Sequence, residues 1–291
     1  MEAWRETVNS AWTGFPGDGM VRGHGSANRD DGMTDAAPDA AIPIAMIPRT
    51  MVTNAAVAPV VVVQFPDLWG RNVSPFGLKL EAWLRLADIP YTVEPSTSLA
   101  KAPKGKLPYI RDEGRLIGDT TLIIEYLKQS RGIDPDAGLD PRERAEALMI
   151  QRLFEDHFYY VMAYSRWIDE AGWSTLQPAF FGRLPFPVGR VAAGHFRRRV
   201  KRMLHLQGMG RHRPEEIYAM GRQDLEAVAD YLGDRPFLMG DQLTTVDAVA
   251  YAFLANVLYL PFETELKRIV LEFPTLVTYC DAMEQGLQPE H

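Results

Sequence analysis

The stretch that decides the fold is residues 74–87, SPFGLKLEAWLRLA, an amphipathic helix that directly follows an apolar strand. Serine is a preferred N-cap residue and proline suits the first helical position, so Ser74 and Pro75 mark the start of the helix. Upstream, residues 60–65, VVVVQF, form a β-branched run typical of a strand. Apolar residues recur along one side of the helix at helical spacing. The polar residues fall on the other side: Lys79, Glu81, Arg85 and Asp88.

The start of this helix is a candidate anion site. The Ser74 hydroxyl lies where unpaired backbone N–H groups and the positive end of the helix dipole converge. Two more polar or proline-marked points follow along the chain, at Leu107-Pro108 and at Asp119-Thr120. Serine, aspartate and threonine also cap helices without any ligand, so ligand contact and plain capping are both open here.

The segments around these positions predict a small α/β domain at residues 59–133. Residues 89–94 form a second strand, entered through a proline. Residues 108–111 and 115–117 are short apolar segments around Asp112-Glu113-Gly114, a hairpin signal. One more amphipathic helix completes the domain, so the order is β-α-β and then β-β-α.

Residues 140–285 carry no strand signal and predict an all-helical domain. Asp140-Pro141 opens a long helix with a cap and a proline at its first position. A proline-rich break at residues 178–187 separates it from the next helix. Thr244, followed three residues later by Asp247, is a capping box in its aspartate variant and starts a very apolar helix.

The composition favours a soluble, cytoplasmic protein. The chain has 291 residues, of which 46% are hydrophobic and 24% charged, so it can bury a sizeable core. A formal net charge of −7 gives no reason to expect nucleic acid as a partner. The single cysteine, Cys280, excludes an internal disulfide and a multi-cysteine metal site, and we expect no metal. The apolar run at residues 55–63 is far shorter than the ~20 residues of a membrane-spanning helix.

Residues 1–58 differ from the rest of the chain. They are rich in Gly, Ala, Asp and Pro and show no sustained period. The aspartates argue against a transit peptide, and no apolar core resembles a signal sequence. We therefore expect a disordered N-terminal extension. Translation from Met46 or Met51 is an alternative, since both precede the first strand.

These parts, in this order, resemble the glutathione transferase superfamily, in which a thioredoxin-like α/β domain precedes an all-α domain. The resemblance is carried by Ser74-Pro75-Phe76, by Leu107-Pro108, by Asp119-Thr120, and by Gly240 followed by the Thr244 capping box. It extends from Val60 to near Glu284. Three longer stretches are similar to the branch that contains the failed-axon-connections and metaxin proteins: SPFGLKLEAWLRLADIPY, GDTTLIIEYL and GMGRHRPEEIYAMGRQDL.

The resemblance implies a role for each matching position. Ser74 takes the place of the residue that activates the glutathione thiol. Pro108 matches a cis-proline, and the preceding Leu107 would pair with the cysteinyl backbone of glutathione. Asp119 and Thr120 would receive the γ-glutamyl end. Related proteins of this branch often carry cysteine where this chain has Gly77, so Cys-x-x-Cys chemistry is excluded.

The implied function is a glutathione transferase that uses glutathione as co-substrate and attacks a hydrophobic electrophile, with a homodimer expected from the resemblance alone. Asn72 is an alternative donor to the thiol. The alternative function is a non-catalytic, metaxin-like scaffold that keeps the fold and binds proteins. A second enzymatic alternative is glutathione-dependent dehalogenation or ring opening. Aromatic residues of the helical domain either belong to the core or line an apolar substrate pocket: Tyr159, Tyr160, Tyr164, Trp167 and Trp173. The basic stretch at residues 195–202 is interpreted as a solvated helix face.

Overall fold

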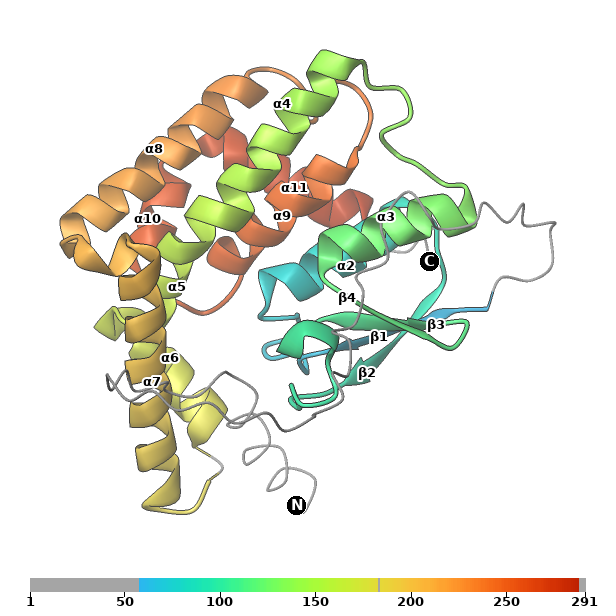
Figure 1. Cartoon of the computed structure of the whole chain (residues 1–291). Coiled ribbons are helices and arrows are strands. Elements are labelled where there is room, and N and C mark those ends of the chain that lie inside the picture. The colour runs from blue at the N-terminus through green and yellow to red at the C-terminus, as the bar shows by residue number, and fades with distance from the viewer. Residues whose placement is uncertain (1–57, 183, 288–291) are drawn as a thin grey trace, which may run out of the picture.

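Residues 60–131, the α/β half of the structure, fold around a four-stranded mixed sheet (Figure 1). The structure is a computed structural model and describes residues 58–182 and 184–287. The strands lie in the order β2-β1-β3-β4; β1 is parallel to β2, and β3 is antiparallel to both of its neighbours. Their bounds are β1 Val60–Gln64, β2 Tyr91–Pro95, β3 Tyr109–Asp112 and β4 Arg115–Gly118.

Two helices lie between this sheet and the second half of the chain (Figure 1). Helix α2 (Pro75–Leu86) follows β1, and α3 (Thr120–Arg131) follows β4. Glu113 and Gly114, both at positive φ, close the β3–β4 hairpin that the sequence predicts. The opposite face of the sheet carries the loop with the short helix η2 (Pro103–Gly105). This is the predicted thioredoxin-like α/β arrangement.

The second half, residues 141–286, is helical as predicted: apart from the isolated bridge between Phe237 and Gly240, its described residues form helices and loops. It is built around α9 (Thr245–Leu258). This helix is buried from Val246 to Leu258, which fits a helix that is apolar all round. The Asp247 carboxylate accepts hydrogen bonds from the Thr244 N–H (2.9 Å) and hydroxyl (2.7 Å), which confirms the capping box. The other helices are α4 Pro141–Arg152, η3 Leu153–Phe158, α5 Tyr159–Trp167, α6 Glu170–Phe181, α7 Val188–Gln207, η4 Met209–Arg211, α8 Pro214–Leu232, α10 Glu265–Leu271 and α11 Pro274–Gly286.

Two predictions about the helical half need correction, and one helix was missed. The break at residues 178–187 starts too early, because Pro178 lies inside α6. Proline there removes only one backbone hydrogen bond near the helix end, and the last turn of α6 packs Phe181 against Phe196 (ring centroids 5.9 Å apart). The long helix from residue 140 contains a π-helical turn, η3. The short helix α10 was not predicted.

The predicted disordered extension at residues 1–58 lies outside the described residues, apart from Ala58. Within the described ranges, none of the helices combines the length and the apolar character that crossing a membrane requires.

Candidate functional site

The sheet register brings the three predicted site segments to one edge. Val63 at the end of β1 pairs with Tyr109 at the start of β3, and Tyr109 also pairs with Gly118 at the end of β4. The loop that leads to Ser74, the Leu107-Pro108 segment and the Asp119-Thr120 segment therefore leave the sheet side by side. The strand pairing alone brings these segments together, although they are far apart in the sequence.

Ser74 is the N-cap of α2, as predicted. Its half-buried hydroxyl accepts a long hydrogen bond from the Gly77 N–H (3.4 Å). Among the described residues, no acceptor takes the hydroxyl proton of Ser74. The side chain thus caps the helix and keeps a donor available beside the positive helix end.

Asn72, the alternative donor, faces the protein interior. Its side-chain amide donates to the Phe65 carbonyl (3.1 Å), and its side-chain oxygen accepts from the Ser74 N–H (2.9 Å). Only 2% of Asn72 is exposed, whereas Ser74 is half-buried. A Cβ on Gly77 would lie 2.7 Å from the Asn72 side-chain oxygen. This position therefore requires glycine because the Asn72 side chain packs directly against its Cα, and not because the backbone has a positive φ.

The peptide bond between Leu107 and Pro108 is cis, as the resemblance implies. The Leu107 side chain is buried in a small cluster with Val63 and Tyr109. Within residues 58–182 and 184–287, neither the N–H nor the carbonyl of Leu107 has a hydrogen-bond partner. An extended ligand could pair with both groups as an added strand does.

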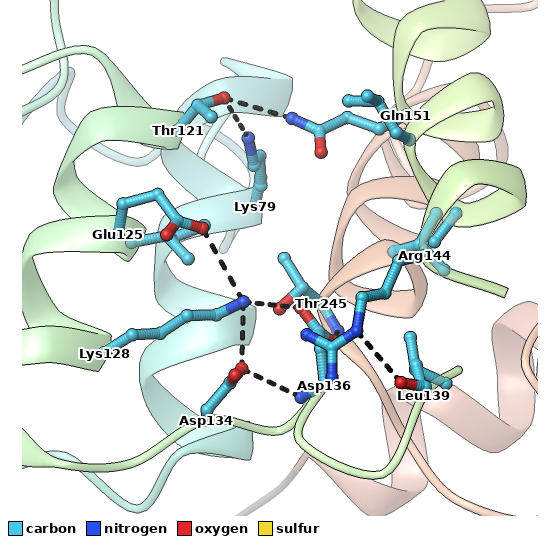
Figure 2. A pocket seen from close by; sticks show the side chains of 14 residues that line it. Lys79, Thr121, Glu125, Lys128, Asp134, Asp136, Leu139, Arg144, Gln151 and Thr245 are labelled. Carbon is cyan, nitrogen blue, oxygen red and sulfur yellow. Dashed lines mark hydrogen bonds and ion pairs between the residues drawn. The ribbon is translucent and has the colours of Figure 1, made fainter. Parts of the chain in front are cut away.

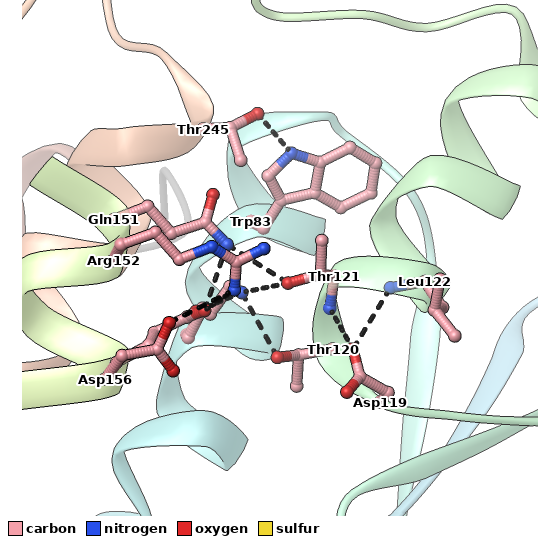
Figure 3. A network of polar contacts seen from close by, with 11 residues as sticks. Trp83, Asp119, Thr120, Thr121, Leu122, Gln151, Arg152, Asp156 and Thr245 are labelled. Carbon is pink, nitrogen blue, oxygen red and sulfur yellow. Dashed lines mark hydrogen bonds and ion pairs between the residues drawn. The ribbon is translucent and has the colours of Figure 1, made fainter. Parts of the chain in front are cut away.

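Asp119 has φ 81°, which is unusual for a residue other than glycine. Its carboxylate caps α3 by accepting from the N–H groups of Thr121 (3.1 Å) and Leu122 (3.3 Å), as Figure 3 shows. Positive φ at such a residue costs about 1–3 kcal/mol and is concentrated at functional sites. The exposed Asp119 is thus held in a fixed orientation at the sheet edge.

Thr120 is buried, and its hydroxyl accepts a hydrogen bond from Lys79 (3.1 Å). The side chain therefore faces α2 rather than the site, which leaves the Thr120 N–H, at the first position of α3, as the group without an intrahelical acceptor. A carboxylate could bind there.

Lys79 and Glu155 form a buried ion pair between the two halves of the chain. The Lys79 Nζ lies 2.5 Å from Glu155 Oε1, and the two side chains are 1% and 6% exposed. Gln151 donates to the other Glu155 oxygen (3.0 Å). Burial lowers the pKa of Lys79, which the Glu155 charge only partly offsets. The sequence placed Lys79 on the polar side of this helix. The structure buries it there, because that side faces Thr120 at the start of α3 and Glu155 in η3.

A polar cavity of about 250 Å³ opens next to this pair (Figure 2). It lies between α2, α3, α4 and the start of α9, with Lys79, Thr121 and Gln151 on its walls. Ser74, Leu107, Pro108 and Asp119 do not line it, so we do not assign the predicted site to this cavity. Two cationic side chains that line the cavity already have partners. Lys128 pairs with the carboxylates of Asp134 and Asp136, and Arg144 donates to main-chain carbonyls.

Aromatic residues of the helical half lie beside the start of α2. Phe76, two residues after Ser74, is half-buried and packs against Tyr159 (ring centroids 5.3 Å apart) and Phe253 (5.6 Å). Tyr159 in turn contacts Tyr160 (5.2 Å). The predicted aromatic cluster is thus partly core and partly an apolar surface near Ser74, which could hold a hydrophobic substrate.

Two more side chains of the helical half reach the Ser74 loop and were not predicted. Arg166 donates to the Val73 carbonyl (2.8 Å), and Asn256 donates to the Asn72 carbonyl (3.3 Å). The only sequence signal was a charge inside an aromatic run, Tyr164-Ser165-Arg166-Trp167. Cys280 is fully buried, as expected, and burial raises the pKa of its thiol to about 12.

Comparison with known proteins agrees with this arrangement. A family model described as "Glutathione S-transferase N-terminal domain" matches residues 75–172, and one described as "Glutathione S-transferase, C-terminal domain" matches residues 221–283. The glutathione transferase GSTFuA3 from Phanerochaete chrysosporium has the same fold, with a TM-score of 0.56 at 15% identity, over 81% of this chain and 100% of that one.

Relatives in sequence include enzymes and other proteins. An isoprene-epoxide–glutathione S-transferase from Rhodococcus sp. (strain AD45) is 34% identical over 233 residues, which cover 78% of this chain and 98% of that protein. Failed axon connections from Drosophila melanogaster is 31% identical, over 65% of this chain and 47% of that protein. Metaxin-2 from Mus musculus is 25% identical, over 72% of this chain and 80% of that protein. With matching domains, fold and sequence, the chain belongs to the glutathione S-transferase family.

Proposed function

We propose that this protein is a glutathione transferase in which Ser74 stabilises the glutathione thiolate for attack on a small hydrophobic electrophile. The observation that carries the proposal is the unused hydroxyl donor of Ser74 at the positive end of α2. The exposed Asp119, the Thr120 N–H and the backbone of Leu107 are the groups that would hold the rest of the tripeptide.

The energies are sufficient for this role. A thiol like that of free cysteine has a pKa of ~8.5, so only a few per cent is ionised near neutral pH. Lowering that pKa by two units requires about 2.7 kcal/mol of preference for the anion. A hydrogen bond to a charged group contributes roughly 1.5–3 kcal/mol, and a helix N-terminus about 0.3–1 kcal/mol. One hydroxyl at the start of α2 can therefore supply most of the shift.

An epoxide is the electrophile class that we favour, since the relative from Rhodococcus is named for an isoprene epoxide. The thiolate would form an S–C bond at one ring carbon while the C–O bond to that carbon breaks. The resulting alkoxide takes a proton from water, so the products are a hydroxy thioether and hydroxide. The apolar surface around Phe76 and Tyr159 suits the hydrocarbon part of such a substrate.

Replacing Ser74 by alanine tests the proposal. We expect glutathione-dependent turnover of small epoxides to fall at least tenfold at pH 7, and the thiol pKa of bound glutathione to rise toward its free value. Asp140→Ala is the control, because the exposed Asp140 is also a helix N-cap and accepts from the Glu143 N–H (2.8 Å), at the start of α4. Equal turnover in wild type and Ser74→Ala would remove the proposed role.

A non-catalytic scaffold is the second candidate, and the similarity to failed axon connections and metaxin-2 supports it. It predicts no glutathione affinity by calorimetry and no turnover with a panel of epoxides, halides and other electrophiles. A cytoplasmic location and a homodimer also belong to the proposal, and sedimentation of the purified protein tests the dimer.

A further inference from the structure

Arg166 is a buried cation with no acidic partner. It lies in α5, is 7% exposed, and donates to the Val73 carbonyl (2.8 Å), the Asn256 carbonyl (2.5 Å) and the Asn256 side-chain oxygen (2.9 Å). The Phe262 ring lies 5.1 Å from the guanidinium carbon. In the described part of the chain, no carboxylate lies within ion-pair distance of Arg166.

The neighbours of Arg166 leave its charge uncompensated. Burial lowers the pKa of Arg166 to about 9, so the guanidinium remains charged at neutral pH. The titratable group that faces Arg166 is Tyr159, which lies on the same helix. Burial raises the pKa of Tyr159, so its phenol is neutral and does not balance the charge. The segments packed around it contribute Asn256, Phe262 and Thr264, none of which is charged. A buried charge of this kind is costly unless an anion comes close.

The bonds of Arg166 lead directly to Ser74. The carbonyl that it holds belongs to Val73, whose carbon is joined to the Ser74 nitrogen. Asn256, from α9, also holds the preceding carbonyl, that of Asn72, whose side-chain oxygen accepts from the Ser74 N–H. The backbone on both sides of the Val73–Ser74 peptide is thus fixed from the helical half of the molecule.

We propose that Arg166 is a positioning residue for the thiolate site, which fixes the backbone that carries Ser74 and supplies the positive charge that a bound thiolate balances. This inference rests on the proposed function. It assigns part of the electrostatic stabilisation of the thiolate to a residue of the helical half.

Arg71 provides a matched comparison in the same loop. It forms a bidentate ion pair with Glu284 (2.9 and 3.1 Å) and lies over the Tyr259 ring at 4.8 Å. Its charge therefore already has a counter-ion. If loop anchoring alone mattered, the loss of either arginine would disturb the site in the same way.

The test measures the thiol pKa of glutathione bound to the full chain, from the ultraviolet absorbance of the thiolate against pH. A unit charge several ångströms away at an effective dielectric constant of about 20 shifts a pKa by about one unit or more. We expect Arg166→Gln to raise the thiol pKa by at least that amount, Arg166→Lys to keep most of the wild-type value, and Arg71→Gln to change it by less than about 0.3 units.

Asn256→Asp provides an independent arm that keeps Arg166 in place. It puts a carboxylate 2.9 Å from the guanidinium and neutralises its charge at the cost of the hydrogen bond to Asn72. Asn256→Leu is the matched control, because it loses the same hydrogen bond to Asn72 and adds no charge. We expect Asn256→Asp to raise the thiol pKa more than Asn256→Leu does, a difference that a merely structural role of Arg166 does not produce. The Asn256→Asp variant also tests whether the Arg166 charge lowers the thiol pKa if Arg166→Gln fails to fold.

The outcomes separate the two proposals. If wild-type protein shows no thiolate signal with glutathione, the proposed function fails and this inference fails with it. If wild type lowers the thiol pKa but Asn256→Asp and any folded Arg166→Gln leave it unchanged, the thiolate site stands and the inference is overturned. An equal rise in Arg71→Gln and Arg166→Gln would also overturn it, because loop distortion would then explain both.

Discussion

Glu155→Gln is expected to weaken the link between the two halves of the chain in a pH-dependent way. The substitution keeps the shape of the side chain but leaves Lys79, only 1% exposed at its side chain, without its counter-ion. The hydroxyls of Thr120 (3.1 Å) and Thr121 (3.4 Å) remain within reach of the Lys79 ammonium group. They solvate the charge but do not balance it.

The free energy of unfolding should fall by about 3–4.6 kcal/mol at pH 7. Removing one partner of a buried ion pair costs about 3–5 kcal/mol. The cost has an upper limit, because Lys79 can lose its proton instead. With an ordinary lysine pKa of ~10.4, deprotonation at pH 7 costs about 4.6 kcal/mol.

The sign of the pH dependence follows from the direction of the pKa shift. In the variant, burial without Glu155 lowers the pKa of Lys79 further, so the unfolded state binds more protons than the folded state. The stability of the variant therefore rises with pH, by up to about 1.4 kcal/mol per unit, below the pKa of unfolded lysine. We expect the difference from wild type to be largest near pH 6 and to narrow toward pH 8, as long as wild-type Lys79 keeps its charge.

Urea unfolding of both proteins at pH 6, 7 and 8 measures this difference. Glu263→Gln is the control, because its exposed pair with Lys267 (2.8 Å) should contribute little to stability. A difference below about 1 kcal/mol at pH 7, or one that does not change with pH, would refute the account of Lys79 as a desolvated charge.

Two further changes have expected outcomes. Gly77→Ala puts a Cβ 2.7 Å from the Asn72 side-chain oxygen, so we expect a loss of about 1–3 kcal/mol in stability and weaker glutathione binding by calorimetry. The helical Gly194→Ala, where the nearest atom is 3.8 Å away, should instead be neutral or stabilising. For Glu284, burial raises the pKa, but the bonds from Arg71 and Tyr251 outweigh burial and the net pKa is lowered. At pH 6 the melting temperature of wild type should therefore be higher than that of Glu284→Gln. This difference in melting temperature should shrink as the pH falls below about 4.3, the ordinary pKa of glutamate, and a difference that stays constant would contradict the prediction.

Local signals in the sequence predicted the fold and the Ser74 end of the site. Ser74-Pro75, the Glu113-Gly114 turn and the Thr244–Asp247 box each act through backbone groups within a few residues, so a single sequence displays them completely. The convergence of Ser74, Leu107 and Asp119 at one sheet edge follows from the strand order and register of the structure, which these local signals do not give.

The buried polar contacts between the two halves escaped prediction because the partners lie far apart in the chain. Lys79 meets Glu155 across 76 positions, and Arg166 meets Val73 across 93. One signal was present, however. Residues 76–87 are apolar at most positions around the helix, which is typical of a helix buried on several sides, so a lysine among them needed a buried partner.

The choice between enzyme and scaffold turns on these buried charges. A protein that only holds partners needs its two halves to stay together, and apolar side chains of similar volume serve that purpose as well as a buried ion pair or better. The Arg166 guanidinium is harder to explain in this way, because it has no acidic partner in the described chain and holds the carbonyl next to Ser74. Three hydrogen bonds to oxygen acceptors and the Phe262 ring offset part of its desolvation. On the inference above, a bound thiolate supplies the remaining compensation, and the lone charge then favours the enzyme over the scaffold.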